Sequence, residues 1–239
     1  VRRTVDGAVR PVDAQQLVLD LRATLGVSAT VLPTYLEEIA STLAGRAWKL
    51  RPEAPTSAEL ADADFQTIEA AMTEGHPCFV ANNGRIGFGV DDYHDYAPEV
   101  GPRVRLEWVA VRAEHAVYAA APGLTDQRTL LAGQLDPDEL DAFEKVLRER
   151  GLDPGAYLLV PVHPWQWRNK LAVTFAPQVA TQDLVHLGTG RHAMQPQQSL
   201  RTFFDLDDPG RHYVKTALSV LNMGFMRGLS AAYMEVTPA

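Results

Sequence analysis

The chain has 239 residues, of which 46% are apolar and 22% charged, and its 22 Lys and Arg against 30 Asp and Glu give a formal net charge of −8. These fractions are ordinary for a globular protein and argue against an intrinsically disordered chain, and the acidic balance argues against a nucleic-acid partner, which requires a surplus of cations. No run of about 18 uninterrupted apolar residues occurs, so we expect no membrane-spanning helix. The single cysteine, Cys78, permits no internal disulfide and fits the reducing cytoplasm.

Helical patterns dominate the first third of the chain. Apolar residues recur at three- and four-residue spacings within 15–21 and 35–40, which predicts two helices. A third helix is predicted to begin at Thr56, because Thr56 and Glu59 have the spacing of a capping box. This helix is predicted to end at Gly75.

From residue 76 onward the pattern changes to short strands. Asn82-Asn83-Gly84 predicts the turn of a hairpin, and 91–102 is predicted to be a polar loop. A helix is predicted over 137–150, with Asp136 as its N-cap and Gly151 at its end. The remaining predicted elements are strands at 78–80, 85–90, 105–111 (paired with 116–118), 157–162, 184–187, 199–204 and 213–218, a turn at 207–210, and a final helix from Val220 that carries Arg227.

These elements predict an α+β fold. Its helical region would cover residues 1–74, and a mostly antiparallel sheet region would cover 75–239. The chain begins at Val1 without a methionine and ends at Ala239, soon after its densest run of unusual polar residues. We therefore expect it to be a piece of a longer protein.

Cationic and hydroxyl side chains are concentrated near the C-terminus. Ser199 and Arg201 lie two residues apart on a predicted strand, which points both to one face, and Thr202 follows them. Lys215 lies on the next predicted strand and Arg227 on the final helix. An arginine matches phosphate oxygens with a planar fork and a lysine supplies a compact charge, so the cluster predicts a phosphate site. The alternative is a set of solvated charges on an exposed sheet.

Three further polar residues are candidates for substrate or anion contacts. His163 ends an apolar strand, and with Gln166 it either faces a substrate or nucleotide, or is bonded to the backbone while Trp165 and Trp167 enter the core. His76, before a proline, either binds an anion or caps a loop. The spacing favours neither interpretation of His76.

Two residue types are expected to have no chemical role. Cys78 lies in an apolar run and is expected to be a buried structural thiol. His186, His192 and His212 lack the close spacings of a metal site, so we predict no metal ligands in this chain.

Six motifs occur in an order that resembles a known family. They are Glu74-Gly75-His76-Pro77, Gly84-Arg85-Ile86-Gly87-Phe88, Val162-His163-Pro164-Trp165-Gln166, Ser199-x-Arg201-Thr202, Lys215-Thr216-Ala217 and Met226-Arg227. The set resembles the NRPS-independent siderophore (NIS) synthetases of the IucA/IucC family, and the segments 76–88 and 198–234 look closest to the desferrioxamine branch. The resemblance runs from about residue 74 to the C-terminus.

The resemblance implies an AMP-forming ligase that activates a carboxylate with ATP and Mg²⁺ and joins it to an amine. The desferrioxamine type acts on hydroxamate units built from a diamine and succinate, and the family tends to form homodimers. The family fold is described as a hand; this chain would cover the thumb, over 1–74, and most of the fingers. The palm, which supplies the Mg²⁺ carboxylates, would be absent, so we expect this chain alone to be inactive.

The resemblance also implies roles for individual residues. The side chains that contact the ATP phosphates would be Ser199, Arg201, Thr202, Lys215 and Arg227, with His76 nearby, and the three cations would be catalytic because they stabilise charge on phosphate oxygens. This chain departs from many relatives at Phe79-Val80 and Asn83, where a second His-Pro and a Lys occur, which weakens the case for a citrate-type substrate. A binding module without chemistry, for an anion, a nucleotide or a protein, is the main alternative; phosphoryl transfer is another.

Overall fold

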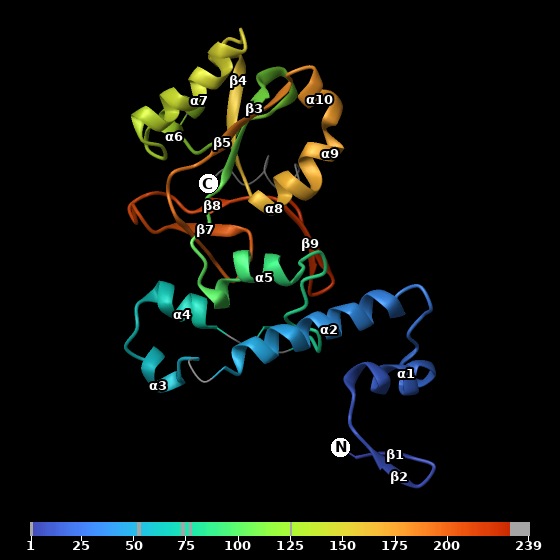
Figure 1. The fold of residues 1–239 in the computed structure, drawn as a ribbon. Helices are drawn as coiled ribbons and strands as arrows, with labels where there is room; N and C mark the ends of the chain where they lie inside the picture. The colour runs from blue at the N-terminus through green and yellow to red at the C-terminus, as the bar shows by residue number, and fades with distance from the viewer. Residues whose placement is uncertain (1, 52–53, 73–74, 77, 125, 230–239) are drawn as a thin grey trace.

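The helices of the N-terminal region lie at one end of the molecule and a three-stranded sheet lies at the other (Figure 1). The computed structural model describes residues 2–51, 54–72, 75–76, 78–124 and 126–229. The helices are α1 (Ala14–Leu25), α2 (Leu32–Lys49), α3 (Ser57–Leu60), α4 (Phe65–Ala71), α5 (Val90–Tyr96), α6 (Gln127–Ala132), α7 (Pro137–Glu149), α8 (Pro164–Gln166), α9 (Ala172–Thr174) and α10 (Ala176–Ala180). The strands are β1 (Arg3–Val5), β2 (Ala8–Arg10), β3 (Glu107–Arg112), β4 (Tyr157–Val162), β5 (Leu184–Thr189), β6 (Met194–Pro196), β7 (Thr202–Asp205), β8 (Val214–Lys215), β9 (Leu218–Asn222) and β10 (Phe225–Arg227).

The predicted α+β class is confirmed, and so are the first two helices. Helices α1 and α2 pack around Val18 and Ile39. The predicted third helix is wrong in length, because it divides into α3 and α4. The Thr56 capping box begins α3 as predicted, but the Asp64 carboxylate accepts a hydrogen bond from the Thr67 amide at 2.9 Å and so begins a separate helix. The β1–β2 hairpin was not predicted.

The three-stranded sheet at the end away from the N-terminal helices, called the upper sheet below, is antiparallel, in the order β4-β3-β5. Helix α7 packs on β5. Its core includes Trp108 and Phe143, whose ring centroids lie 5.6 Å apart. The prediction that 116–118 pairs with the first strand of this sheet is wrong, because β4 and β5 occupy both edges of β3. The end of α7 is confirmed, since Gly151 has a φ of +73°.

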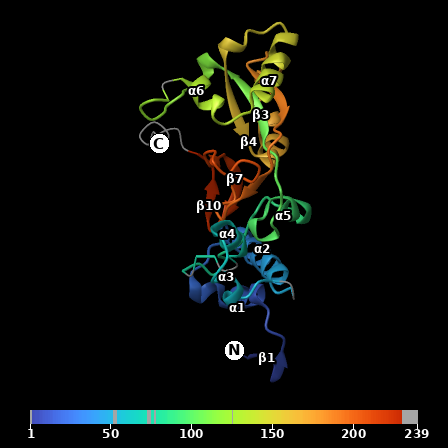
Figure 2. The same ribbon diagram turned by 90° about the vertical axis from the view of Figure 1, so that its left-hand side faces the viewer.

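A second sheet, in the order β6-β7-β8, lies with the β9–β10 hairpin between the upper sheet and helices α2 and α4 (Figure 2). Phe203 of β7 and Leu218 and Val220 of β9 are buried in one hydrophobic core. The predicted final helix is wrong: the chain turns at Met223 and Gly224, both with positive φ, and returns as β10. An Asn-x-Gly sequence favours this kind of turn over a helix.

The segment between the two regions differs most from prediction. The predicted hairpin over 78–90 is wrong: in that segment, which the structure describes throughout, only Ile86 pairs, through an isolated bridge to Leu221. The prediction that 91–102 is a polar loop is wrong, because 91–96 belong to helix α5. Cys78 is exposed, contrary to the buried thiol expected from its apolar run, because the strand that would have buried it does not form.

Parts of two predicted motifs lie outside the described residues. These parts are Glu74, Pro77 and the stretch 230–234. In the described part of the chain, every helix is too short or too polar to cross a lipid bilayer.

Candidate functional site

The predicted phosphate cluster begins in a tight turn between β6 and β7. Ser199 and Arg201 precede β7, so the prediction that both lie on a strand is wrong. The turn brings Ser199 to Thr202 instead: the Ser199 Oγ accepts from the Thr202 amide at 3.1 Å and donates to the Thr202 Oγ1 at 2.7 Å. Leu200, with a φ of +68°, is 1% exposed and anchors the turn in the core. The turn, and not strand alternation, therefore sets the position of Ser199.

Lys215 joins this group through strand pairing. Thr202 and Lys215 lie directly opposite each other in the antiparallel β7–β8 pair, so their side chains share one face of the sheet. The Thr216 amide donates to the Arg201 carbonyl at 2.8 Å, which fixes the register beside them. Lys215 is exposed.

Arg201 and Arg227 come together at the end of β10. The Arg201 Nη1 donates to the carbonyl oxygens of Arg227, at 2.8 Å, and of Gly228, at 2.5 Å. Burial lowers the pKa of both guanidinium groups, and the charge of Arg227 lowers that of Arg201 further. Bringing two cations together is unfavourable without an opposing charge, so this pair creates a site for an anion.

No ion pair neutralises Arg201, Lys215 or Arg227 within the described ranges of the chain. Other arginines have carboxylate partners: Arg112, for example, lies 2.8 Å from Asp183 and Arg85 lies 2.9 Å from Glu99. Of these three cations, Arg201 lies against Arg227, and Lys215 lies opposite Thr202, whose hydroxyl is bonded to that of Ser199. This combination of charge and donors suits phosphate oxygens.

His76 stands apart from these five side chains. Its Nδ1 accepts a hydrogen bond from the Cys78 amide at 3.2 Å, and its ring meets Phe79 edge to face. Among the described residues no hydrogen bond or ring contact joins His76 to the cluster. The turn that carries Ser199 does approach this part of the chain, because the Gln198 side chain donates to the carbonyl of Met72 at 3.1 Å.

His163 and Gln166 are buried, and their polar contacts are with the protein. The His163 Nδ1 accepts from the Trp165 amide at 3.1 Å, and burial lowers the pKa of His163 to about 3. Gln166 accepts from the Ser219 amide at 2.7 Å and donates to its hydroxyl at 3.0 Å. The structure therefore favours the interpretation in which His163 is bonded to the backbone and Trp165 is in the core, although the buried His163 Nε2 has no hydrogen-bond partner among the described residues.

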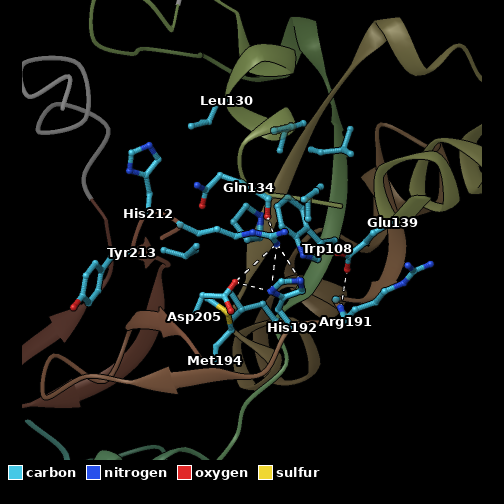
Figure 3. Close-up of a pocket in the computed structure, with 18 of the residues that line it drawn as sticks. Trp108, Leu130, Gln134, Glu139, Arg191, His192, Met194, Asp205, His212 and Tyr213 are labelled. Carbon is cyan, nitrogen blue, oxygen red and sulfur yellow. Dashed lines mark hydrogen bonds and ion pairs between the residues drawn. The ribbon is translucent and has the colours of Figure 1, made fainter. Parts of the chain in front are cut away.

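A cavity of about 260 Å³ lies between α6, α7, the upper sheet and β8 (Figure 3). Lys215 is among its lining residues, whereas the Tyr213 side chain points away from it. The cavity combines an apolar wall with an ionic cluster. The apolar wall includes Leu106, Trp108, Leu131, Leu159 and Met194.

The ionic cluster joins α7 to the β7–β8 hairpin. The His192 Nδ1 lies 2.8 Å from Asp205, its Nε2 lies 3.2 Å from Asp136, and the Arg211 Nη2 lies 2.5 Å from Asp136. Burial by itself would lower the pKa of His192, but the two carboxylates outweigh burial and raise it. Asp136 holds the predicted N-cap position, yet its side chain makes no cap hydrogen bond because Arg211 and His192 engage it.

Ligand atoms of Asp136, Glu139 and His192 also lie within 4.8 Å of one another. All three already bind protein groups, since Glu139 accepts from the Arg191 amide at 2.7 Å. We therefore assign no metal to them. This proximity is invisible in the sequence, where 56 residues separate Asp136 from His192.

Comparison with known proteins places this chain in a family. The model of the IucA / IucC family matches residues 64–239, which include all six candidate phosphate residues. The chain belongs to the IucA/IucC family. A putrebactin synthase of Shewanella sp. (strain MR-4) is 49% identical over 238 residues, which are 100% of this chain and 38% of that protein. The aerobactin synthase of Escherichia coli is 33% identical over 237 residues, 99% of this chain and 40% of that protein.

Solved structures of this family have the same fold. The petrobactin biosynthesis protein AsbB of Bacillus anthracis str. Sterne matches with a TM-score of 0.84 at 26% identity, covering 96% of this chain and 37% of that one. The aerobactin synthetase IucC of a hypervirulent Klebsiella pneumoniae matches with a TM-score of 0.77 at 35% identity, covering 88% of this chain and 39% of that one. The IucA/IucC chain thus spans well under half the length of these relatives.

Sequence reasoning missed the residues that support the cluster. Asn222 accepts hydrogen bonds from Arg227, and Glu38 on α2 accepts from the Gly224 amide at 2.9 Å. The Asn222-Met223-Gly224 turn signal could have placed Arg227 on a hairpin. No local signal marks Glu38, because its partner lies 186 residues away.

Proposed function

We propose that this chain supplies the phosphate-binding part of the ATP site of a siderophore synthetase. The observation that carries the proposal is the convergence of Arg201 and Arg227 without a carboxylate partner in the described part of the chain. Lys215 and the hydroxyl groups of Ser199 and Thr202 extend the same site. Membership of the IucA/IucC family and likeness to siderophore synthases support the assignment of this site to ATP.

In the proposed reaction ATP activates a carboxylate with loss of pyrophosphate, and an amine then displaces AMP to form an amide. The five side chains would bind and orient the phosphate groups. Fixed guanidinium and ammonium groups stabilise charge that builds up on phosphate oxygens. The two guanidinium groups need little reorganisation, because hydrogen bonds to backbone carbonyls hold Arg201 and the Asn222 amide holds Arg227. The partial burial of Arg201 and Arg227 strengthens this effect, since water screens their charges less.

The remaining parts of the site are also proposals. We expect Mg²⁺ to accompany ATP, and because no described carboxylate is bonded to the five side chains, we assign no residue of this chain to the metal. The substrates are proposed to be acyl units built from a diamine and succinate, as in the desferrioxamine type. Four expectations stay predictions. They are that His76 lies near the phosphates, that the full-length enzyme is a homodimer, that it is cytoplasmic, and that this chain alone is inactive.

The proposal is tested with Arg201→Ala in the full-length enzyme that contains this chain. We expect ATP-dependent coupling to fall by about 100-fold or more, because the variant removes one of two adjacent cations. Arg128→Ala is the matched control: Arg128 is exposed and pairs with Glu144 on the surface. Normal turnover by Arg201→Ala would refute the role of the cluster.

The nucleotide product distinguishes the alternatives. Release of AMP supports a ligase, whereas release of ADP would indicate phosphoryl transfer. A binding module would show a thermal shift with ATP, ADP or sulfate but no carboxylate-dependent release of pyrophosphate.

A further inference from the structure

Asn222, the last residue of β9, has a buried side chain with 6% of its surface exposed. Its Oδ1 accepts hydrogen bonds from Nε and Nη2 of Arg227, at 3.2 and 2.5 Å. Its Nδ2 donates to the carbonyl oxygen of Gly84 at 2.7 Å. Both ends of the amide are thus occupied, so the side chain is held in one orientation between two segments of the chain.

The geometry of the β9–β10 hairpin directs Arg227 back toward Asn222. Asn222 pairs with Phe225 across the tight turn. The register then shifts between Met226 and Arg227, so that Arg227 lies opposite Leu218. An irregularity of this kind re-aims a side chain at a strand end, and here it brings the guanidinium beside the amide of Asn222.

Helix α2 contacts both the β9–β10 turn and the segment around Gly84. The Glu38 carboxylate accepts from the Gly224 amide at 2.9 Å, and Gly84 packs so closely that an added Cβ would lie 2.7 Å from the Glu38 carbonyl oxygen. Ile86 and Leu221 exchange two backbone hydrogen bonds, of 2.9 and 3.0 Å. Asn222 is therefore fixed on a frame that includes the helical region.

The partner of Arg227 is a neutral amide. A carboxylate at this place would orient the guanidinium equally well but would cancel the charge that an incoming phosphate needs. The amide oxygen occupies Nε and Nη2 and leaves Nη1 without a partner among the described residues. The group therefore keeps both its full charge and a free donor.

We propose that Asn222 is a positioning residue that orients the Arg227 guanidinium toward the phosphate groups of ATP. The inference rests on the proposed function and adds to it the reason why Arg227 is correctly placed. It connects helix α2 to the phosphate cluster through Glu38, the turn at Gly224 and Asn222.

The experiment measures KM for ATP and for the carboxylate and amine substrates in the full-length enzyme. Asn222→Leu is expected to raise KM for ATP by about tenfold while the other two KM values change by less than about twofold. Asn222→Ala, which removes the amide without adding bulk, is expected to act in the same direction because it also deprives Arg227 of its acceptor. It decides the question if the leucine variant fails to fold.

Gln127→Leu is the matched control for a purely structural loss. Gln127 also bridges two backbone groups, the amide and carbonyl of Leu159, at 2.9 and 2.7 Å. It lies on α6 beside the upper sheet, and we expect a similar loss of thermal stability with an unchanged KM for ATP (Figure 1).

Arg227→Ala separates failure of the inference from failure of the proposed function. If Arg227→Ala impairs use of ATP while folded Asn222 variants keep KM for ATP within about twofold of wild type, the positioning role is refuted and the site stands. If Arg227→Ala itself leaves KM and turnover unchanged, the proposed site is refuted and the inference with it.

Discussion

The buried ion pair between Arg85 and Glu99 gives the sharpest prediction about stability. The two side chains are 3% and 2% exposed, and Arg85 Nη2 lies 2.9 Å from a Glu99 oxygen. The Tyr93 hydroxyl donates to the other Glu99 oxygen at 2.6 Å. Glu99→Gln keeps the size of the side chain and removes its charge, so the variant leaves the Arg85 guanidinium buried without a counter-ion.

The cost follows from burial. Removing one partner of a buried ion pair destabilises a protein by about 3–5 kcal/mol, because the remaining charge has lost both water and its partner. For a chain of this size that loss lowers Tm by roughly 6–20 °C, at about 2–4 °C per kcal/mol. The effect extends beyond the pair, since Arg85 precedes Ile86, whose bridge to Leu221 supports the hairpin of Arg227.

Urea denaturation and thermal melting at neutral pH measure this loss. The control is Glu149→Gln, the same change in a pair with Lys145 whose side chains are 65% and 66% exposed, and its effect should stay within about 0.5 kcal/mol. A Glu99→Gln variant as stable as this control would refute the reasoning that burial makes the pair costly to break.

The pH dependence offers an independent check. Burial by itself would raise the pKa of Glu99, but Arg85 and the Tyr93 hydroxyl outweigh burial and hold the pKa below its usual 4.5. A lowered pKa in the folded state contributes stability above the unfolded-state pKa, and this contribution is lost as the pH falls through the folded-state pKa. The difference between wild type and Glu99→Gln should therefore shrink in acid.

Two further predictions concern packing and the ionic cluster. Gly84→Ala should lower the free energy of unfolding, measured by urea denaturation, by about 1–3 kcal/mol, since the new Cβ would lie 2.7 Å from a backbone oxygen of Glu38. Gly133→Ala, whose new Cβ would have its nearest atom at 3.6 Å, should be close to neutral. Equal stabilities of the two variants would contradict the close approach at Gly84. The raised pKa of His192 contributes stability at pH values below its ordinary pKa of 6.5, and this stability is lost as the pH rises through the folded-state pKa. Wild type should therefore lose more stability than His192→Gln as the pH rises above about 6.5, and parallel pH profiles would argue against the cluster.

Local signals predicted those elements whose own residues suffice to define them. Asp136 and Gly151 mark the ends of α7, and the alternating or apolar runs of β3, β4 and β5 are continuous in the chain. The prediction failed where a local pattern was short. Segment 78–90 has hairpin chemistry at Asn82-Asn83-Gly84, but it lies against α2 and β9, and these contacts override turn propensity.

The sequence by itself determined the α+β class and the family resemblance, and it singled out Arg201, Lys215 and Arg227 as candidate phosphate-binding cations, because residue type and order are properties of the chain. Only the tertiary structure decided how the cations meet. Strand pairing places Lys215 opposite Thr202, a hairpin in place of a helix brings Arg227 to Arg201, and Asn222 holds it there. These contacts join distant parts of the chain, and they form only when burial of the shared core offsets the entropy of bringing those parts together.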